Sequence, residues 1–504
     1  MATKPNAEKK ERKSLSSYSI LFIIIFAVGI ITVIASLFTS DITGASLPDI
    51  LDSSVEGLID AAEISFFLLI LGGCLGIVTK IGALNAGITA LVRNMKGHEL
   101  LLIPIIMAVF AILGSSYGFC EETVPFYALL SMTMVAAGFD TMVASATVLL
   151  GAGVGCLGAT VNPFANGVAI DMLNQSGVAV NTGTTIILGL VLLAASYAIA
   201  VFFIMRYARK VKADKGSTIL SLQEQKAMDQ TFGPEAQAGA AAGKAAADGE
   251  ALDPNAPMTR VQKITLALFG LAFLVMIVGF IPWQSFGVDL FALGGVFDAE
   301  TESWVVLPWS AWITGLPLGE WYFKDASVWF LLMSVIIGVV ARMSESDLVG
   351  TWIDGAADMV GVALVVGLAR AIAILMASTH LDVVILDNAS NLLQGSPAFI
   401  FAPVAYLIFL GLSFIITSSS ALATISMPLM GSLATSLSFS PDVVVMLFVA
   451  ANGLANLFSP TAAFLPGLMM AKVEYPTWLK WAAVPIVAIG VASVAILTVA
   501  MMIL

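Results

Sequence analysis

Long apolar runs recur along the whole chain, and each is close to the length that crosses a lipid bilayer. The first extends from Ser19 to Phe38, and a helix needs about 20 such residues to span the hydrocarbon core. Hydrophobic residues make up 59% of the chain and charged residues 11%, which excludes an ordinary soluble domain. Backbone groups in lipid must be paired inside the protein. We therefore expect an all-α polytopic membrane protein.

The first apolar run is expected to be a retained helix. It follows the basic segment KPNAEKKERK at positions 4–13, as the apolar part of a signal peptide would. It is too long for that part of a signal peptide, however, and no small-residue cleavage site follows it.

The positions of charged residues predict which segments lie on each side of the membrane. Lys and Arg gather at four places: the N-terminus, Arg93 with Lys96, residues 206–215, and Arg260 with Lys263. Cytoplasmic loops carry an excess of these residues, so we expect a cytoplasmic N-terminus and an external C-terminus, in the inner (plasma) membrane of a prokaryote. Acidic residues dominate positions 41–60 and 289–325, which we expect to face outward, and the second span is predicted from Leu58 to Ile77. The net charge of −12, without a basic face, argues against binding of nucleic acid.

Two pairs of polar segments interrupt the apolar sequence. They are GSSYGFCEET (114–123) with GATVNPFANG (158–167), and TSSSALAT (417–424) with NGLANLFSPTA (452–462). Ser115 and Ser418, in the first member of each pair, are 303 positions apart. A bilayer core tolerates unwound backbone only where protein or a water-filled cavity satisfies it. Matching interruptions therefore predict a buried site at the interface of an internal repeat, as in secondary transporters.

Each pair is interpreted as a re-entrant hairpin followed by a broken transmembrane helix. An extra crossing between the halves turns the second half over in the membrane, which gives an inverted repeat. The predicted division is a cytoplasmic N-terminus (1–17), a first repeat (18–206) with hairpin 98–138 and broken helix 141–175, a flexible cytoplasmic linker (207–262), an extra helix with an external loop (263–325), and a second repeat (326–504) with hairpin 398–438 and broken helix 441–471.

The polar residues at the interruptions are candidates for binding a cation and a small anionic group. Hydroxyl, amide and freed carbonyl oxygens suit Na⁺, and the N-termini of half-helices suit a carboxylate. For any single residue the alternative is close packing of small side chains or a proline kink. The matching positions favour a site. The substrate-binding candidates from these segments are Ser116, Asn166, Ser419, Ser420, Thr424 and Asn452.

Three charged residues within the apolar sequence are further candidates for binding the substrate. An ionised carboxylate at membrane depth costs roughly 2.5–3.5 kcal/mol or more unless it is paired. Glu121 and Glu122 are therefore candidates for a proton or cation site, or for binding a substrate ammonium. The alternative is that they cap the first turn of a hairpin arm. Arg370 is a candidate partner for a substrate carboxylate or for a glutamate, and helix packing is its alternative.

The remaining reactive residues show no catalytic or metal-binding pattern. Cys74, Cys120 and Cys156 lie in or beside apolar segments without metal-ligand or disulfide spacing, so buried free thiols are expected. No catalytic triad, HExxH or Walker sequence stands in a usable context. We expect neither an enzyme nor a cofactor beyond a coupling ion, Na⁺ or H⁺.

Several stretches resemble one transporter family. They are SSYGFCEETVPFYALL with GAGVGCLGATVNPFANGVA in the first half, NGLANLFSPTAAFLPGLMMAKVEYPTWLKW in the second, and KIGALNAGITALV near residue 80. Together they are similar to the YfcC-type, C4-dicarboxylate anaerobic carrier-like family of the ion transporter superfamily. The resemblance implies a scaffold domain, a mobile transport domain with elevator-like movement, and a homodimer.

The resemblance also implies two cation sites with substrate between them. The implied cation-binding residues are Ser115, Ser116 and Asn162 for the first site, with Ser418, Ser419, Asn456, Ser459 and Thr461 for the second. Glu122 matches the family's acidic hairpin position. The TSSSALAT segment departs from the family, in which this tip more often contains glycine.

These observations predict a secondary active transporter, a symporter or an exchanger, for a small solute that carries a carboxylate. Glu121 and Glu122 favour an amino acid, such as a basic amino acid, over the alternative of a C4-dicarboxylate. A passive channel or facilitator on the same scaffold would conduct without concentrating its solute. A membrane enzyme or receptor ranks last, because neither a catalytic constellation nor a folded cytoplasmic domain is visible.

Overall fold

The computed structural model describes residues 17–504, except positions 85, 88, 89, 91–97, 117, 121, 122, 234–257, 282, 302, 417, 463 and 464. Nine helices in this part of the chain are long and apolar enough to cross a membrane. The expectation of a helical, polytopic membrane protein is confirmed. The described residues also include a small antiparallel β-hairpin in the predicted external loop. It pairs β1 (Val296–Asp298) with β2 (Ser303–Val306).

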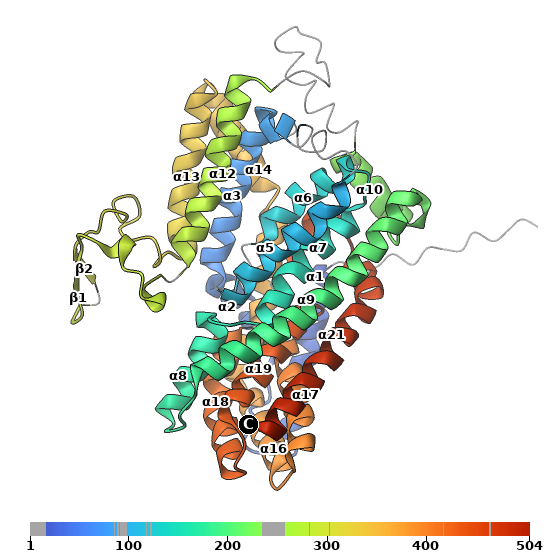
Figure 1. The fold of residues 1–504 in the computed structure, drawn as a ribbon, viewed down its shortest axis with the longest axis vertical. Helices are drawn as coiled ribbons and strands as arrows, with labels where there is room; N and C mark the ends of the chain where they lie inside the picture. The colour runs from blue at the N-terminus through green and yellow to red at the C-terminus, as the bar shows by residue number, and fades with distance from the viewer. Residues whose placement is uncertain are drawn as a thin grey trace, which may run out of the picture.

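Seven helices pack against one another and form what we name the first helix group. Figure 1 shows α3, α12, α13 and α14 of this group side by side, with the β1–β2 hairpin projecting beside them. The members are α1 (Ser17–Ser36), α2 (Leu47–Asp60), α3 (Ala62–Lys80), α12 (Arg260–Phe280), α13 (Phe323–Val340), α14 (Glu345–Ala357) and α15 (Val360–Ser378).

The other large helices form the second helix group, in which α5 packs on α7, α17 packs on α19, and α7 contacts α19. The members are α5 (Leu102–Ser116), α6 (Val124–Ala136), α7 (Thr141–Leu157), α8 (Val168–Gln175), α9 (Thr182–Ala213), α17 (Ala398–Ile415), α18 (Ser419–Ser436), α19 (Pro441–Ala455), α20 (Leu465–Met470) and α21 (Tyr475–Ile503). Helix α16 (Leu381–Leu393) contacts both groups, through α15 on one side and through α17 and α18 on the other.

Short elements complete the described chain. The π-helical turn η3 (Pro163–Gly167) precedes α8, and α10 (Leu222–Phe232) follows α9. The 3₁₀ turns are η1 (Glu99–Leu101), η4 (Lys215–Ser217), η5 (Trp283–Phe286) and η6 (Leu290–Ala292).

Helix α7 is the centre of the second group, because all 17 of its residues are buried. Its glycines let the backbone of α5 approach closely. A Cβ on Gly155 would lie 2.3 Å from the carbonyl oxygen of Ala111, and a Cβ on Gly114 would lie 2.4 Å from that of Ala152. Small residues at such contacts allow tight packing of transmembrane helices. The Ser115 end of α5 is thereby held against the end of α7.

A comparable contact joins α2 to α15 in the first group. A Cβ on Gly57 would lie 2.5 Å from the carbonyl oxygen of Gly367 and 2.6 Å from the nitrogen of Ala371. Asp60 lies one helical turn beyond Gly57, and Arg370 lies one turn beyond Gly367. The close approach of the two backbones therefore brings these charged side chains together.

Helices α2 and α14 were not expected from the sequence. The apolar run predicted to begin at Leu58 is divided in the structure, with α3 starting at Ala62 after a separate α2. Helix α2 has a capping box in which Ser46 and Asp49 bond each other's backbone. Its acidic residues suggested an external loop, but its Gly57 face packs on α15, and tertiary packing of one face stabilises such a helix.

The predicted linker also begins later than expected, because α9 continues to Ala213 and α10 lies within residues 207–262. Two buried carboxylates order this region. Asp140, the N-cap of α7, accepts hydrogen bonds of 2.6 Å from both Tyr207 and Thr218. Glu224 accepts from the backbone N–H of Glu474 at 2.8 Å. Most of the remaining linker, residues 234–257, lies outside the described residues.

We expect Gly57→Ala to lower the midpoint of thermal unfolding in detergent, because its methyl group collides with backbone atoms that cannot rotate away. Overpacking of this kind costs about 1–3 kcal/mol. Gly411→Ala is the matched control: Gly411 is also inside a helix, but beyond its own helical turn no described atom lies within 4 Å of the position that its Cβ would take. The control should be neutral or slightly stabilising. Equal midpoints for both variants would contradict the close contact.

Candidate functional site

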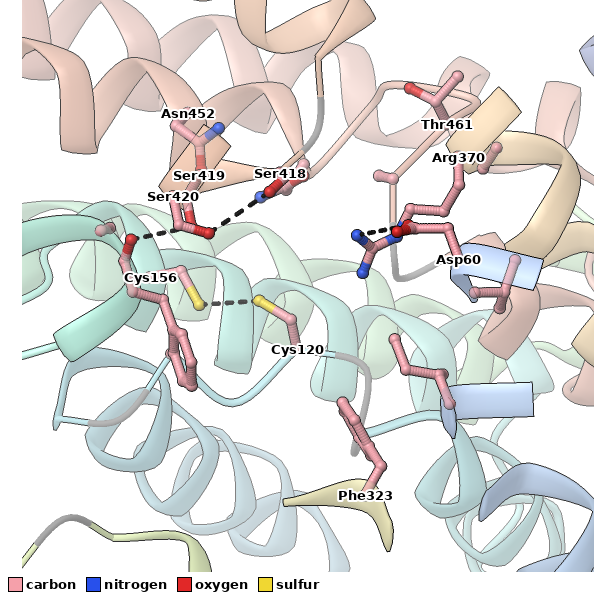
Figure 2. Close-up of a pocket in the computed structure, with 18 of the residues that line it drawn as sticks. Asp60, Cys120, Cys156, Phe323, Arg370, Ser418, Ser419, Ser420, Asn452 and Thr461 are labelled. Atoms are coloured by element: carbon pink, nitrogen blue, oxygen red, sulfur yellow. Dashed lines mark hydrogen bonds and ion pairs between the residues drawn. The ribbon is translucent and has the colours of Figure 1, made fainter. Parts of the chain in front are cut away.

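A cavity of about 340 Å³ lies between the two helix groups. The first group contributes the junction of α2 and α3, the start of α13, and α15. The second contributes the connection from α5 to α6, the start of α18, and the segments that follow α7 and α19. Figure 2 shows the serines of α18 on one side of the cavity and the Asp60–Arg370 pair on another. The site thus includes residues from both groups.

Eight of the predicted site residues line this cavity. They come from both interrupted halves and from α15, and they are Asn162, Arg370, Ser418, Ser419, Ser420, Asn452, Asn456 and Thr461.

The first helix break, which follows the end of α7 at Leu157, is held against the end of α5 by hydroxyl groups that bond backbone carbonyls. Ser115 donates to the carbonyl of Gly158 at 2.8 Å. The carbonyl of Ser115 in turn accepts from the backbone N–H of Thr160 at 2.9 Å and from its hydroxyl at 3.2 Å. A buried carbonyl without a partner costs free energy. These bonds satisfy the end of α5 where the helix has stopped.

The second break repeats this arrangement with different side chains. The carbonyl of Phe414, near the end of α17, accepts from Ser459 at 2.8 Å and from the hydroxyl of Thr461 at 3.0 Å. The two hydroxyls also lie 2.6 Å apart. The two carbonyl–hydroxyl pairs, Ser115 with Thr160 and Phe414 with Ser459, each span 45 residues.

This equivalence corrects the one drawn from sequence spacing. By its contacts the counterpart of Ser115 is Phe414, not Ser418. Ser418 instead is the N-cap of α18, and its hydroxyl accepts from the backbone N–H of Ala421 at 3.4 Å. The equivalent atoms of Ser115 and Phe414 are backbone carbonyls, so side-chain identity could not reveal them.

The cavity contains an ion pair that includes a residue not anticipated. Arg370 Nη1 lies 3.3 Å from Asp60 Oδ2, and Glu63 lines the same cavity. The side chains of Arg370 and Asp60 are 33% and 52% exposed, so both charges remain accessible to a solute. The sequence suggested the glutamates of 121–122 as partners of Arg370. Asp60 and Glu63 were missed because they stood in a segment interpreted as an external loop and the start of a span.

Two cysteines expected to be unrelated free thiols also meet in the cavity wall. The sulfur atoms of Cys120 and Cys156 are 3.1 Å apart, as the dashed line in Figure 2 shows. Cys120 belongs to the connection between α5 and α6, and Cys156 to the last turn of α7. The third cysteine, Cys74, is buried in α3.

The other predicted site residues lie away from the cavity or outside the described part. Ser116 and Thr424 bond carbonyls of their own helices, and Ser115 and Ser459 are buried within the two helix breaks. Asn166 is 2% exposed, and its amide nitrogen donates to the carbonyl of Ala159 at 3.2 Å. Ser115, Ser459 and Asn166 turn inward because a break leaves local carbonyls to satisfy. Glu121 and Glu122 lie outside the described residues.

Comparison with known proteins identifies the family. The family model described as the C4-dicarboxylate anaerobic carrier, DcuC, matches residues 14–502. The chain belongs to the DcuC family. It is therefore a multi-pass secondary transporter, and membership of a transporter family implies that it is not an enzyme.

Two curated relatives cover most of the chain. An uncharacterised protein of Haemophilus influenzae is 29% identical over 438 residues, which are 86% of this chain and 74% of the relative. YfcC of Escherichia coli (strain K12), named as a proposed basic amino acid antiporter, is 26% identical over 87% of this chain and 78% of YfcC. The family resemblance found in the sequence is thus confirmed.

Two solved transporter structures align over almost the full length but are distant. MtrF of Neisseria gonorrhoeae, from a class described as antimetabolite efflux pumps, has a TM-score of 0.42 and 14% identity, covering 98% of this chain and 96% of MtrF. YdaH of Alcanivorax borkumensis has a TM-score of 0.41 and 13% identity, covering 96% of this chain and 98% of YdaH.

We expect Thr461→Val to lower thermal stability, because it removes a hydroxyl that satisfies the buried carbonyl of Phe414. A lost hydrogen bond of this kind costs about 0.5–1.5 kcal/mol. The control is Thr133→Val, whose hydroxyl bonds the carbonyl of Leu129 within the turn of its own helix. Unfolding midpoints measured for both variants should differ, with Thr461→Val the lower. Equal midpoints would show that the hydroxyl does not hold the break.

Proposed function

We propose that the protein is a secondary active transporter of basic amino acids that operates by alternating access. The observation that carries the proposal is the set of opposite charges in one cavity, Arg370 with Asp60 and Glu63. A basic amino acid carries a carboxylate and two cationic groups at neutral pH. Arg370 suits the carboxylate, because guanidinium binds carboxylates bidentately. Asp60 and Glu63 suit the cationic groups.

The size and polarity of the cavity support this substrate class. Its volume lies within the range of small-molecule sites, about 300–1,000 Å³. Ser419, Ser420 and Asn452 add hydroxyl and amide groups that can bond an amino acid along its length. The name of YfcC points to the same substrate class.

The competing substrate within the family is a C4-dicarboxylate, which the family description favours. Such a dianion would gain from Arg370 and from the N-terminus of α18, where the helix dipole favours negative charge. It would also meet two carboxylates, Asp60 and Glu63. Like charges at short range are unfavourable, so the charges of the described lining favour a substrate that carries cationic groups.

The mechanism in this proposal is movement of the second helix group against the first, as an elevator. The support for it is that the cavity lies between the groups and that the two helix breaks lie within one of them. The proposal includes an inverted repeat with re-entrant hairpins at α5–α6 and α17–α18, a homodimer, and an inner-membrane location with a cytoplasmic N-terminus and an external C-terminus.

Coupling to Na⁺, to H⁺ or to a counter-substrate is also proposed. The donors around the two breaks are hydroxyl and carbonyl oxygens, which suit a hard cation such as Na⁺. Residues Thr461 and Asn162 would contribute to such sites. Among the described residues no group of three or more His, Cys, Asp or Glu side chains could hold a metal ion, which is consistent with neutral oxygen donors.

Counterflow in proteoliposomes tests the function. Vesicles loaded with unlabelled arginine, lysine, ornithine or a C4-dicarboxylate are given the labelled solute, with and without imposed Na⁺ or H⁺ gradients. We expect labelled basic amino acids to accumulate above equilibrium. Counterflow of the dicarboxylate alone would contradict the proposed substrate. Conductance in a planar bilayer without accumulation would instead indicate a channel.

Arg370→Gln should raise the KM for the transported amino acid about 10- to 150-fold, the effect of losing a charged hydrogen bond worth roughly 1.5–3 kcal/mol. Arg209→Gln is the matched control, because Arg209 is exposed on α9 away from the cavity. Initial rates of uptake across a range of solute concentrations measure the difference. An unchanged KM in Arg370→Gln would remove Arg370 from the binding site.

A further inference from the structure

The cavity wall contains two cysteine thiols that lie close together, those of Cys120 and Cys156. Cys120 is half-buried and Cys156 is 7% exposed, and both line the cavity. Their sulfur atoms are 3.1 Å apart, whereas a disulfide bond is about 2.05 Å long. A decrease of about 1 Å in the separation of the two sulfur atoms would therefore bring them to bonding distance.

The backbone at Gly118, two residues before Cys120, packs closely against Asn162 in the break after α7. Gly118 has φ +89°, and a Cβ there would lie 2.6 Å from the amide nitrogen of Asn162. Cys120 follows two residues later and faces Cys156 at the end of α7. The turn, the break after α7 and the thiol pair thus share one side of the cavity.

We propose that Cys120 and Cys156 form a reversible dithiol–disulfide site within the cavity, oxidised by a small peroxide. Cys120 reacts first because it is the more exposed of the two residues. Its thiolate attacks hydrogen peroxide, the O–O bond breaks, and Cys120 becomes a sulfenic acid as hydroxide leaves. Cys156 then attacks the sulfur of Cys120, the S–O bond breaks, and the S–S bond forms. Two thiols and one peroxide give one disulfide and two waters.

Metal binding by the two thiols is less favoured by the structure than oxidation. A structural metal site needs further ligands, typically four in total, and no group of three or more His, Cys, Asp or Glu side chains gathers among the described residues. A small oxidant fits the cavity of about 340 Å³. The adjacent partner sulfur is the arrangement in which a sulfenic acid is converted to a disulfide.

The disulfide would tie the connection between α5 and α6 to α7. The two cysteines are 36 positions apart, so the bond closes a loop of moderate length and restricts the unfolded chain. Oxidation should therefore stabilise the protein and hold the cavity wall in one arrangement. The site is independent of the identity of the transported solute.

Counting free thiols in the purified full-length protein tests the proposal. After reduction, denaturation and alkylation, all three cysteines of the chain should be labelled. After treatment with hydrogen peroxide, only Cys74 should be labelled, and the intact mass should fall by two hydrogens. A small dithiol should restore all three labels. Three labels after peroxide, or a mass gain from sulfinic acid at Cys120, would overturn the proposal.

Thermal unfolding supplies a second, independent readout. Peroxide should raise the midpoint in the wild-type protein and in Cys74→Ala, and a dithiol should reverse the rise. Neither Cys120→Ala nor Cys156→Ala should show it. A rise that persists in Cys156→Ala would assign the effect to another residue and would overturn the proposed pairing. Because neither readout requires a transported solute, failure here is distinct from failure of the proposed function.

Discussion

The carbonyl groups of Ser115 and Phe414, in the last turns of α5 and α17, are hydrogen-bonded to other segments inside the protein, and much of the architecture around the cavity depends on this. In a membrane interior these groups have no bulk water to bond, so an unsatisfied carbonyl would cost several kcal/mol. The hydroxyl group of Thr160 donates a hydrogen bond to the carbonyl of Ser115, and those of Ser459 and Thr461 donate to the carbonyl of Phe414. Each contact ties a helix end to the break after α7 or α19. Unwound backbone is thereby stable deep in the second helix group.

The same constraint explains why a polar cavity can exist between the two helix groups. The chain after each break carries polar side chains to the surface of the second group, where they face the first. The first group presents charge at the matching position, because the close contact of Gly57 with α15 sets Asp60 beside Arg370. The charged pair and the polar breaks therefore belong to different groups. In the proposed mechanism, relative movement of the groups changes access to a solute between them.

Much of this organisation could be predicted from the sequence, because its signals are local and strong. Apolar runs of bilayer length predicted most of the long helices, and the polar interruptions at 158–167 and 452–462 coincide with the ends of α7 and α19. Hydroxyl and amide residues of these two interruptions, together with the serines of the segment at 417–424, supplied seven of the eight predicted residues that line the cavity. A bilayer restricts backbone so strongly that departures from helix are visible in the sequence.

The remainder depends on contacts between distant segments. Asp60 could not be placed in the site, because its position beside Arg370 follows from packing of α2 on α15, 310 residues away. The sequence spacing paired Ser115 with Ser418, whereas the contacts pair it with Phe414. The two halves share a hydrogen-bonded backbone carbonyl at this position, and a carbonyl leaves no mark on the choice of side chain. The pairing of Cys120 with Cys156 likewise follows from the turn at Gly118 and from packing of α5 on α7.

The proposed function requires that solute binds between the two helix groups, at the paired helix breaks. A single-particle structure of the protein with saturating arginine, compared with one without it, tests this most directly. We expect new density for arginine in the cavity, with its carboxylate end at Arg370 and its cationic end toward Asp60 and Glu63. Arginine density at any other place, with this cavity unchanged, would contradict it.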